Sequence, residues 1–183
     1  MPGATRPNAV FVMPYCEVDG IRTFKDSEVK SFFERIERDG LKEIVFMHGD
    51  IPTADAFLQE MKSGRSLLYV VYADELQAGL IWLNRFEGKT CRVHFTSFSE
   101  SWEMDTVEIG RCAIRQIMYM QTGLGEYVFD VLLGLTPSRN VRAIRWLEKV
   151  GLKKVGKIPG CMWDDKAHES VDGTLMYLTR QEG

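Results

Sequence analysis

The chain has 183 residues, of which 45% are hydrophobic and 27% are charged, and its net charge is −3 at pH 7. These values are ordinary for a single globular domain spanning residues 1–183, and the acidic balance gives no global case for a nucleic-acid partner. No apolar run approaches the roughly 20 residues that a membrane helix needs, and the dispersed histidines and cysteines offer no metal site.

The first 40 residues are expected to contain one helix. Residues 1–22 look irregular, apart from a candidate short strand at 10–13. Asp26 or Ser27 can cap a helix that ends at Gly40. Its apolar residues recur at i, i+3, i+4 and i+7, the period of a helix with one buried face: Val29, Phe32, Phe33 and Ile36.

The next segments predict a helix followed by an antiparallel meander. Residues 43–49 are expected to form a short strand or an extended connector. Thr53 begins a second helix that ends before Gly64, with Phe57, Leu58 and Met61 on its apolar face. Three strand-like runs follow at 66–73, 76–86 and 90–98. Because the links between them are hairpin-sized, the three strands should be antiparallel.

The second half of the chain alternates helices and strands. A helix is expected over 105–121, and the nearly continuous apolar run 127–135 is typical of a strand buried on both sides. A right-handed crossover through this helix would make 127–135 parallel to 90–98. The remaining elements are a helix at 140–150, strands at 152–158 and 174–181, and between these strands a polar loop that holds Trp163, Asp164, Asp165 and His168. This order predicts a mixed sheet with helices packed on its faces.

The junction before the helix at 105–121 is a candidate phosphate site. A helix N-terminus presents unpaired N–H groups, Gly110 would let a ligand approach the backbone, and Arg111 and Arg115 add positive charge. Asp105 and Glu108 suit the helix dipole but repel an anion. The alternative interpretation is that Gly110 only allows close packing of the helix on the sheet.

A second candidate site is the segment TPSRNVRAIRWLEKVGLKKVG, residues 136–156. One side of its helix is an apolar stripe, and another side carries Arg139, Arg142, Arg145 and Lys149. Asn140 follows the buried strand, so it lies at the sheet edge where ligands commonly bind in α/β folds. Two other interpretations stay open: Ser138 or Asn140 only caps the helix, and the basic side is only solvated.

The run NVRAIRWLEKVGL resembles the C-terminal motif of the GNAT N-acetyltransferase superfamily, N-x-x-A/S-x-x-hydrophobic-hydrophobic/Tyr-E-K-x-G-F. The matching residues are Asn140, Ala143, Glu148, Lys149 and Gly151, with Leu152 in the aromatic place. Leu147 makes the motif nearest to the RimJ/RimL-like branch, and it stands where many members have a tyrosine that protonates the departing thiolate. In the pyrophosphate motif, Val107 and Cys112 replace a polar and a small residue.

The resemblance implies a single-domain GNAT-like α/β (mixed α+β) fold. Its sheet would be central, mixed and mostly antiparallel, with helices on both faces and a splay between strands 90–98 and 127–135. Acetyl-CoA, the acyl donor substrate, would lie in the splay, with its pyrophosphate on the turn 109–113 and its pantetheine along the backbone of 95–98. The expected binding residues are Phe95, Thr96, Ser97, Phe98, Ile109, Gly110, Arg111, Cys112, Ala113, Asn140 and Arg142.

Acyl transfer to an amine needs a base and backbone donors that polarise the thioester carbonyl. The candidate catalytic residues are His94 and Glu100, on or just beyond the strand that would flank the thioester. The ordinary alternatives are a satisfied histidine in a sheet for His94 and a solvated loop acid for Glu100.

The expected function is N-acyl transfer from acetyl-CoA to an amine, by direct transfer, in a monomer or homodimer. The amine could be a protein N-terminus, a lysine or a small amine such as a polyamine, flanked by the acids at 100–105 and at 164–165, unless those acids are only solvated. One alternative is a GNAT-fold module that binds CoA or a partner without catalysis. Another is an α/β domain whose basic helix binds nucleic acid or a phosphorylated partner. Scattered cysteines, and no signal peptide in MPGATRPNAV, predict a cytoplasmic protein.

Overall fold

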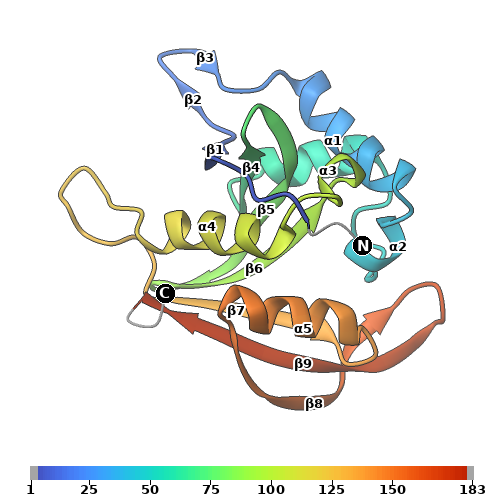
Figure 1. The fold of residues 1–183 in the computed structure, drawn as a ribbon. Helices are drawn as coiled ribbons and strands as arrows, with labels where there is room; N and C mark the ends of the chain where they lie inside the picture. The colour runs from blue at the N-terminus through green and yellow to red at the C-terminus, as the bar shows by residue number, and fades with distance from the viewer. Residues whose placement is uncertain (1–3, 181–183) are drawn as a thin grey trace.

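The computed structural model describes residues 4–180. It contains a seven-stranded sheet in the order β1-β4-β5-β6-β7-β9-β8, and β2 and β3 form a separate two-stranded ribbon (Figure 1). The strands are β1 (Val10–Pro14), β2 (Glu17–Val18), β3 (Ile21–Arg22), β4 (Ser66–Ala73), β5 (Leu76–Glu87), β6 (Thr90–Ser97), β7 (Val131–Pro137), β8 (Lys153–Asp164) and β9 (Glu169–Thr179). The helices are α1 (Asp26–Arg38), α2 (Lys42–Val45), α3 (Ala54–Lys62), the 3₁₀ helix η1 (Ser99–Ser101), α4 (Thr106–Met118) and α5 (Val141–Val150).

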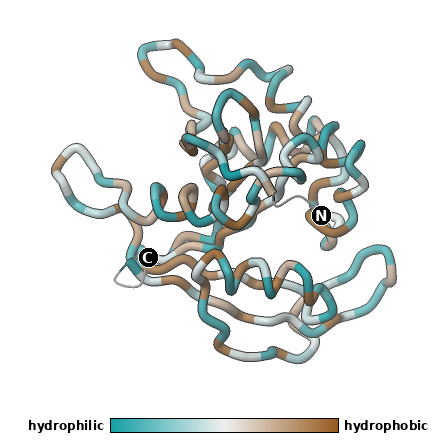
Figure 2. The backbone as a smooth tube through the Cα atoms, in the orientation of Figure 1, coloured by the Kyte–Doolittle hydropathy of each residue, from teal (hydrophilic) through white to brown (hydrophobic). Residues whose placement is uncertain are grey.

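Helices pack on both faces of the sheet, as expected for this fold class. On the face that we call the α1/α3 face, side chains of α1 and α3 bury the strand residues Leu68, Val70, Leu80 and Trp82. On the opposite α4/α5 face, α4 and α5 bury Ile81, Val93, Leu132 and Met176. Among the described residues, the α1/α3 core includes no side chain of β7, β8 or β9. Helices therefore leave that face open over these three strands, while Figure 2 shows hydrophobic residues gathered in the central strands.

The predicted topology is confirmed. Strands β4, β5 and β6 form the antiparallel meander, and the crossover through α4 makes β6 and β7 parallel. Helix α3 begins where expected, because Thr53 Oγ1 accepts the N–H of Ala56 at 3.2 Å. Helix α1 is one residue early: Lys25 occupies the N-cap position, and its N–H donates to the Glu28 carboxylate, so neither Asp26 nor Ser27 caps the helix.

The splay between β6 and β7 is confirmed. The parallel ladder holds only three residue pairs, and the last of them joins Arg92 to Leu133. Beyond it, β6 continues to Ser97 and β7 to Pro137 without pairing with each other, while β7 stays paired with β9 to its end. In Figure 1 the two strands diverge toward the side of the molecule that carries α2 and the turn between β8 and β9.

Several predicted boundaries in the first half and around the crossover are wrong. Residues 43–49 form neither a strand nor an extended connector: α2 turns the chain so that Phe46 stacks on Phe33 in the α1/α3 core. Within 1–22, β1 confirms the candidate strand, and the ribbon of β2 and β3 was not expected. The helix expected to reach residue 121 ends at Met118, because Tyr119 leaves the helical conformation and its hydroxyl donates to the Arg180 carbonyl.

The strand expected at 127–135 begins only at Val131. The residues just before it are bound by Arg180 instead of by a neighbouring strand: Arg180 donates to the Phe129 carbonyl and pairs with the Asp130 carboxylate. It is not buried on both sides either. Leu133 and its alternate neighbours are half-buried because no helix covers the α1/α3 face there.

The polar loop predicted between the last two strands is the far end of a hairpin. β8 continues to Asp164 and β9 starts at Glu169, so only a short turn separates them. The pattern is polar because this arm extends beyond the core, and Figure 2 shows the turn as hydrophilic. The final strand, predicted over 174–181, is observed to Thr179, and residue 181 lies outside the described residues.

Candidate functional site

The part of β6 beyond its last pair with β7 forms one wall of the splay. Phe95 is half-buried, Thr96 is buried, and the Ser97 hydroxyl accepts the Trp102 indole N–H at 3.2 Å. Phe98 is fully buried in the α1/α3 core, with the Arg35 guanidinium 3.6 Å from its ring centroid. The strand therefore offers its backbone toward the splay, while these side chains are engaged elsewhere in the fold.

Helices α4 and α5 are packed against each other beside the splay through Trp146. The indole contacts the Phe95 ring, with 4.6 Å between centroids, and lies directly over Gly110. A Cβ atom added to Gly110 would lie 2.6 Å from Trp146 Cη2 and 3.0 Å from Val150 Cγ2. The absence of a side chain at Gly110 thus permits close packing of α4 on α5, whereas the alternative raised for this glycine was close packing of the helix on the sheet.

The first turn of α4 is occupied by charged side chains that pair with one another. Asp105 caps the helix by accepting the Glu108 N–H at 3.0 Å. The Glu108 carboxylate in turn accepts hydrogen bonds from Arg6 at 2.8 Å and from Arg111 at 3.0 Å. Hydrogen bonding by Arg6 lowers the pKa of Glu108 below its usual value. Two carboxylates therefore occupy the helix end that the sequence predicted as a phosphate site.

The remaining residues of the predicted pyrophosphate turn have structural contacts. Ile109 and Ala113 are buried in the α4/α5 core. Arg111 also donates to the Lys149 carbonyl of α5 at 2.8 Å, and the Cys112 thiol lies 3.7 Å from the Glu108 carboxylate. This turn is thus tied to α5 and to the N-terminal segment.

The first turn of α5 carries the opposite charge. Asn140 caps the helix by accepting the Ala143 N–H at 3.1 Å, and no acid lies in the first turn. Arg142 and Arg145 are exposed, and neither has an ion-pair partner among residues 4–180. Asn140 therefore acts as an N-cap, while Arg142 leaves a free cation beside it.

His94 lies on the α1/α3 face of β6. Its ring stacks on Trp82 with 5.0 Å between centroids, and Nε2 lies 3.1 Å from Asn84 Oδ1. Because an amide oxygen can only accept, Nε2 carries the proton and Nδ1 keeps its lone pair. Burial lowers the pKa of His94 to about 3, and the nearby charges of Arg92, His48 and Arg85 act in the same direction. His94 is therefore neutral at pH 7 and a weak base.

Glu100 lies in η1, beyond the end of β6, and contacts α1. Its carboxylate accepts from Arg38 at 2.7 Å and lies 3.2 Å from Arg35. Burial alone would raise the pKa of Glu100, but its backbone N–H and the two guanidinium groups outweigh this and lower the pKa to about 2. No contact joins Glu100 to His94 in the described part of the chain, so the two candidate bases do not form one constellation.

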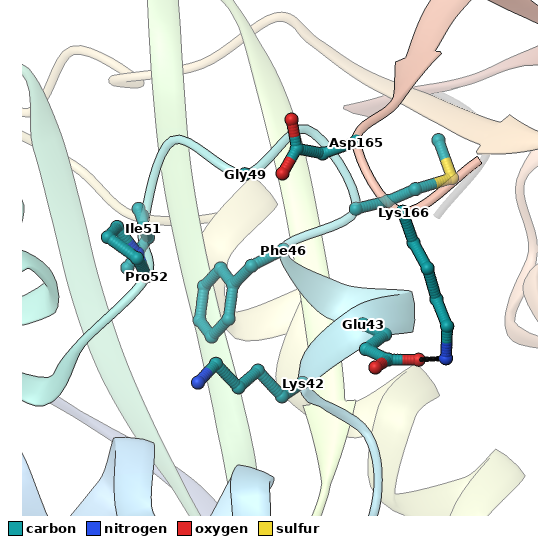
Figure 3. Close-up of a pocket in the computed structure, with 9 residues that line it drawn as sticks. Lys42, Glu43, Phe46, Gly49, Ile51, Pro52, Asp165 and Lys166 are labelled. Carbon is teal, nitrogen blue, oxygen red and sulfur yellow. Dashed lines mark hydrogen bonds and ion pairs between the residues drawn. The ribbon is translucent and has the colours of Figure 1, made fainter. Parts of the chain in front are cut away.

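The turn between β8 and β9 contacts the segment around α2, on the side to which the splay opens. The Asp165 N–H donates to the Met47 carbonyl at 3.0 Å, and His48 Nδ1 lies 2.9 Å from the Trp163 carbonyl. Lys166 pairs with Glu43 at 2.5 Å. A pocket of about 230 Å³ lies at this contact, and Figure 3 shows Lys42, Phe46 and Pro52 on one side of it and Asp165 and Lys166 on the other.

Two of the acids predicted to flank a cationic amine, Glu100 and Asp164, have cationic partners in the chain. Asp164 is buried and pairs with Arg139, which also contacts the Met47 sulfur. Asp165 has no cationic partner among the described residues, and its carboxylate accepts the Trp163 indole N–H at 3.4 Å. Asp165 therefore keeps its charge available beside the pocket.

Several of these contacts were not anticipated from the sequence. Arg6 falls in a segment expected to be irregular, and only the tertiary fold brings it to Glu108. The i, i+3 spacing of Arg35 and Arg38 could have indicated a cationic pair on α1. It could not have indicated that Glu100, 62 residues after Arg38, would join the pair.

Residues 4–180 contain neither a candidate membrane-spanning helix nor a candidate metal centre. No helix there combines the length and hydropathy needed to cross a membrane. No three His, Cys, Asp or Glu side chains gather there in a way that could hold a metal ion. Cys16, Cys91, Cys112 and Cys161 are all free.

No protein-family model matches the chain, and no curated protein matches it in sequence. Solved structures match it in fold. Spermidine N-acetyltransferase from Vibrio cholerae, in complex with CoA and spermine, aligns with a TM-score of 0.69 at 11% identity, over 94% of this chain and 96% of that chain. RimL, a ribosomal L7/L12 α-N-protein acetyltransferase, aligns in its apo form with a TM-score of 0.64 at 11% identity, over 94% of each chain. RimL in complex with coenzyme A gives 0.63 at 12% identity, over 87% of this chain and 93% of that chain. The GNAT fold expected from the sequence is thereby confirmed.

Proposed function

We propose that the protein is an N-acyltransferase that moves an acetyl group from acetyl-CoA to an amine by direct transfer. The observation that carries the proposal is the separation of β6 and β7 after three pairs, in a fold shared with acetyltransferases solved with CoA. Beyond the last pair, backbone N–H and C=O groups face no neighbouring strand, and such groups need partners. A pantetheine chain lying between the strands would supply them.

The residues that would hold the donor belong to β6, α4 and α5. Of the residues predicted to bind the pantetheine, Phe95, Thr96 and Ser97 would use the backbone groups that face away from β5. Phe98 is not available, because its N–H donates to the Ala78 carbonyl at 2.9 Å and its own carbonyl accepts the Ser101 N–H at 3.0 Å. The phosphates would lie between the 109–113 turn and α5, where Arg142 is a free cation beside the Asn140 cap. Because these groups are on the α4/α5 side, the acceptor amine would approach the thioester from the α1/α3 face.

Attack by the amine forms a C–N bond and breaks the C–S bond of the thioester, so one proton must leave the nitrogen and the thiolate must gain one. Backbone N–H groups in the splay would polarise the thioester carbonyl. Of the two candidate bases we favour His94, whose Nδ1 has no partner among the described residues, over Glu100, which two arginines hold. Because the pKa of His94 is low, it would accept the proton only transiently and release it to solvent. Leu147 cannot protonate the thiolate, so water would do so.

A second candidate function is a GNAT-fold module that binds CoA or a protein partner without catalysis. The specific observation in its favour is the pair of carboxylates, Asp105 and Glu108, at the helix end where the phosphates were expected. Carboxylates there repel an anion, and this weakens the case for a tightly held donor.

The two candidates are separated by binding and turnover measured together. A ligand at one hundred times its Kd stabilises the folded state by about 2.7 kcal/mol, which raises Tm by roughly 5 to 10 °C. We expect acetyl-CoA at millimolar concentration to raise Tm, and we expect thiol release with at least one of three acceptors: a peptide N-terminus, a lysine peptide or spermine. An unchanged Tm would exclude CoA binding. A raised Tm without turnover of any amine would favour the module.

The whole chain, 1–183, is proposed as one acyltransferase-like domain in the cytoplasm, since four free cysteines fit a reducing compartment. Its proposed assembly is a monomer or homodimer, and light scattering on the purified protein tests this. One matched fold, the Vibrio cholerae spermidine N-acetyltransferase, has been solved as a dodecamer.

A further inference from the structure

Arg92 lies at the base of the splay, on the face from which we propose that the acceptor approaches. It makes the last ladder pair between β6 and β7. Its neighbours Cys91 and Val93 are buried in the α4/α5 core. Since side chains alternate along a strand, Arg92 projects from the α1/α3 face, as His94 does.

Arg92 is half-buried and has no acceptor for its guanidinium in the described part of the chain. Two other arginines among residues 4–180 are also half-buried, and both are held: Arg35 by Gln77 and Glu100, and Arg180 by the Phe129 carbonyl and Asp130. Burying a cation without a partner costs free energy, and an anion that binds there removes that cost.

The charged surroundings of Arg92 are positive. Burial lowers the pKa of Arg92, and the like charge of nearby Arg85 lowers it further, although an arginine stays protonated at neutral pH. Arg85 is exposed at the bulge of β5, and it has no ion pair within residues 4–180. The other titratable groups beside Arg92 are the thiol of Cys161 on β8 and the imidazole of His94, which is neutral at pH 7. No carboxylate of the described residues compensates the two guanidinium groups.

The acids on the same side of the molecule do not balance this charge. Glu100 is paired with α1, Glu43 with Lys166, and Asp164 with Arg139. Asp165, the nearby acid without a cation, lies against Gly49 at the pocket beside α2. The base of the splay is thus a place for an anion, and the pocket beside α2 keeps one negative charge.

We propose that Arg92, supported by Arg85, binds an anionic group of the acceptor, so that the preferred acceptors are amines that carry a carboxylate or a phosphate rather than polyamines. The proposal rests on the proposed function for the direction of approach. We place the thioester beside Phe95, the first residue of the proposed pantetheine site, which follows Arg92 by three strand residues or about 10 Å. This separation between anion and reacting amine corresponds to about three residues of an extended peptide.

The experiment compares matched acceptors in acetyl transfer. The probes are the peptides Ser-Glu-Glu-Gly, Ser-Gln-Gln-Gly and Ser-phosphoserine-Gln-Gly, together with spermine. We expect kcat/KM for the wild type to be at least about tenfold higher for one of the anionic peptides than for the neutral peptide and spermine. The peptide that responds identifies the group as carboxylate or phosphate. Equal values for all probes, or a preference for spermine, would overturn the proposal.

Variants of Arg92 test whether this residue makes the distinction. Arg92→Gln should raise KM for the anionic peptide, so that the ratio of kcat/KM between the anionic and neutral peptides falls to about one, and it should leave the neutral peptide unaffected. Arg92→Lys should keep part of the preference because the charge remains. Arg115→Gln, an exposed site on α4, makes the same change in net charge and should leave the preference unchanged. A preference that persists in Arg92→Gln would assign it to another residue and refute the role of Arg92.

Binding without chemistry separates this inference from the proposed function. Titration calorimetry with the same three peptides, on the full chain without acetyl-CoA, should show tighter binding of an anionic peptide to the wild type than to Arg92→Gln. If that difference appears without any turnover, the anion site stands and the transferase activity fails. If no peptide discriminates between the two proteins, the anion site fails whatever the activity. Circular dichroism of each variant establishes that it is folded.

Discussion

Helices α4 and α5 follow the two diverging strands β6 and β7, and each begins with a short polar side chain that caps its first turn, Asp105 in α4 and Asn140 in α5. Their charges differ. The first turn of α4 adds Glu108 and draws in Arg6, whereas the first turn of α5 has no acid and leaves Arg142 free. A helix N-terminus attracts anions by its dipole, but one carboxylate in the first turn supplies that anion internally.

Similar backbone geometry therefore does not make two helix ends equivalent as ligand sites. Both present N–H groups beside the splay, yet α4 is already neutralised and its Gly110 is covered by Trp146. An incoming phosphate should therefore be held mainly at α5.

The largest expected effect comes from Gly110→Ala. The added methyl group would collide with the Trp146 ring and Val150, so overpacking should lower the free energy of unfolding by about 1–3 kcal/mol. Urea denaturation measures it. Gly156→Ala is the matched control, since nothing lies within 4 Å of a Cβ there. An unchanged stability with weaker acetyl-CoA binding would instead return Gly110 to a role in the ligand site.

The next effect is expected from Arg142→Gln. Removing the free cation at the α5 end should raise the Kd for acetyl-CoA by about fivefold, more at low salt than at high salt. Calorimetry at two ionic strengths checks this, with Arg115→Gln on α4 as the control of equal charge. If only the control weakens binding, the comparison between the two helix ends is reversed.

A smaller effect in the opposite direction is expected from Glu108→Gln. Without this carboxylate, Arg6 and Arg111 become available to an anion, and the Kd for acetyl-CoA should fall by about threefold. The same calorimetric titration applies. Weaker binding in Glu108→Gln would mean that the Glu108 network orders the site instead of closing it.

The smallest expected effect is a pH dependence confined to the α4 end. Because the pKa of Glu108 is lowered in the folded state, its ion pair stabilises the fold above the unfolded pKa of about 4.3, and this contribution is lost as pH falls through the folded pKa. The difference in unfolding free energy between the wild type and Glu108→Gln should therefore shrink below that pH.

The matching change at the α5 end is Asn140→Ala, for which the loss of the cap should lower the free energy of unfolding by about 1 kcal/mol at any pH. A difference for Glu108→Gln that stays constant down to acid pH would contradict the role of the ion pair.

Sequence reasoning anticipated the elements whose packing is local. The apolar spacing of Val29, Phe32, Phe33 and Ile36 predicted α1, and the register of Asn140 with Gly151 predicted both α5 and the fold. The segments that were misjudged depend on distant partners. Residues 43–49 turn into α2 because Phe46 packs on Phe33 and Trp82. Most of β8 is exposed because its residues lie outside both core clusters.

The candidate site was anticipated in outline and not in its electrostatics. The spacing of the motif located the helix beside the splay. The stack of His94 on Trp82, which accompanies the low pKa of His94, joins two different strands and could not be inferred from local spacing. The clamp of Arg35 and Arg38 on Glu100, and the contact of Trp146 with Gly110, likewise need the folded chain. Whether His94 or Glu100 acts as a base stays a prediction.

The early end of the ladder between β6 and β7 has a consequence for the dynamics of a single strand. Residues 93–97 remain paired with β5 along one edge and face the splay along the other. Their amide protons should therefore exchange with solvent deuterium at alternately slow and fast rates along the strand, since only every second amide points toward β5. An acyl donor lying between the strands would protect the fast-exchanging amides and make the exchange rates uniform. The exchange rates of this strand would thus report on the occupancy of the splay residue by residue.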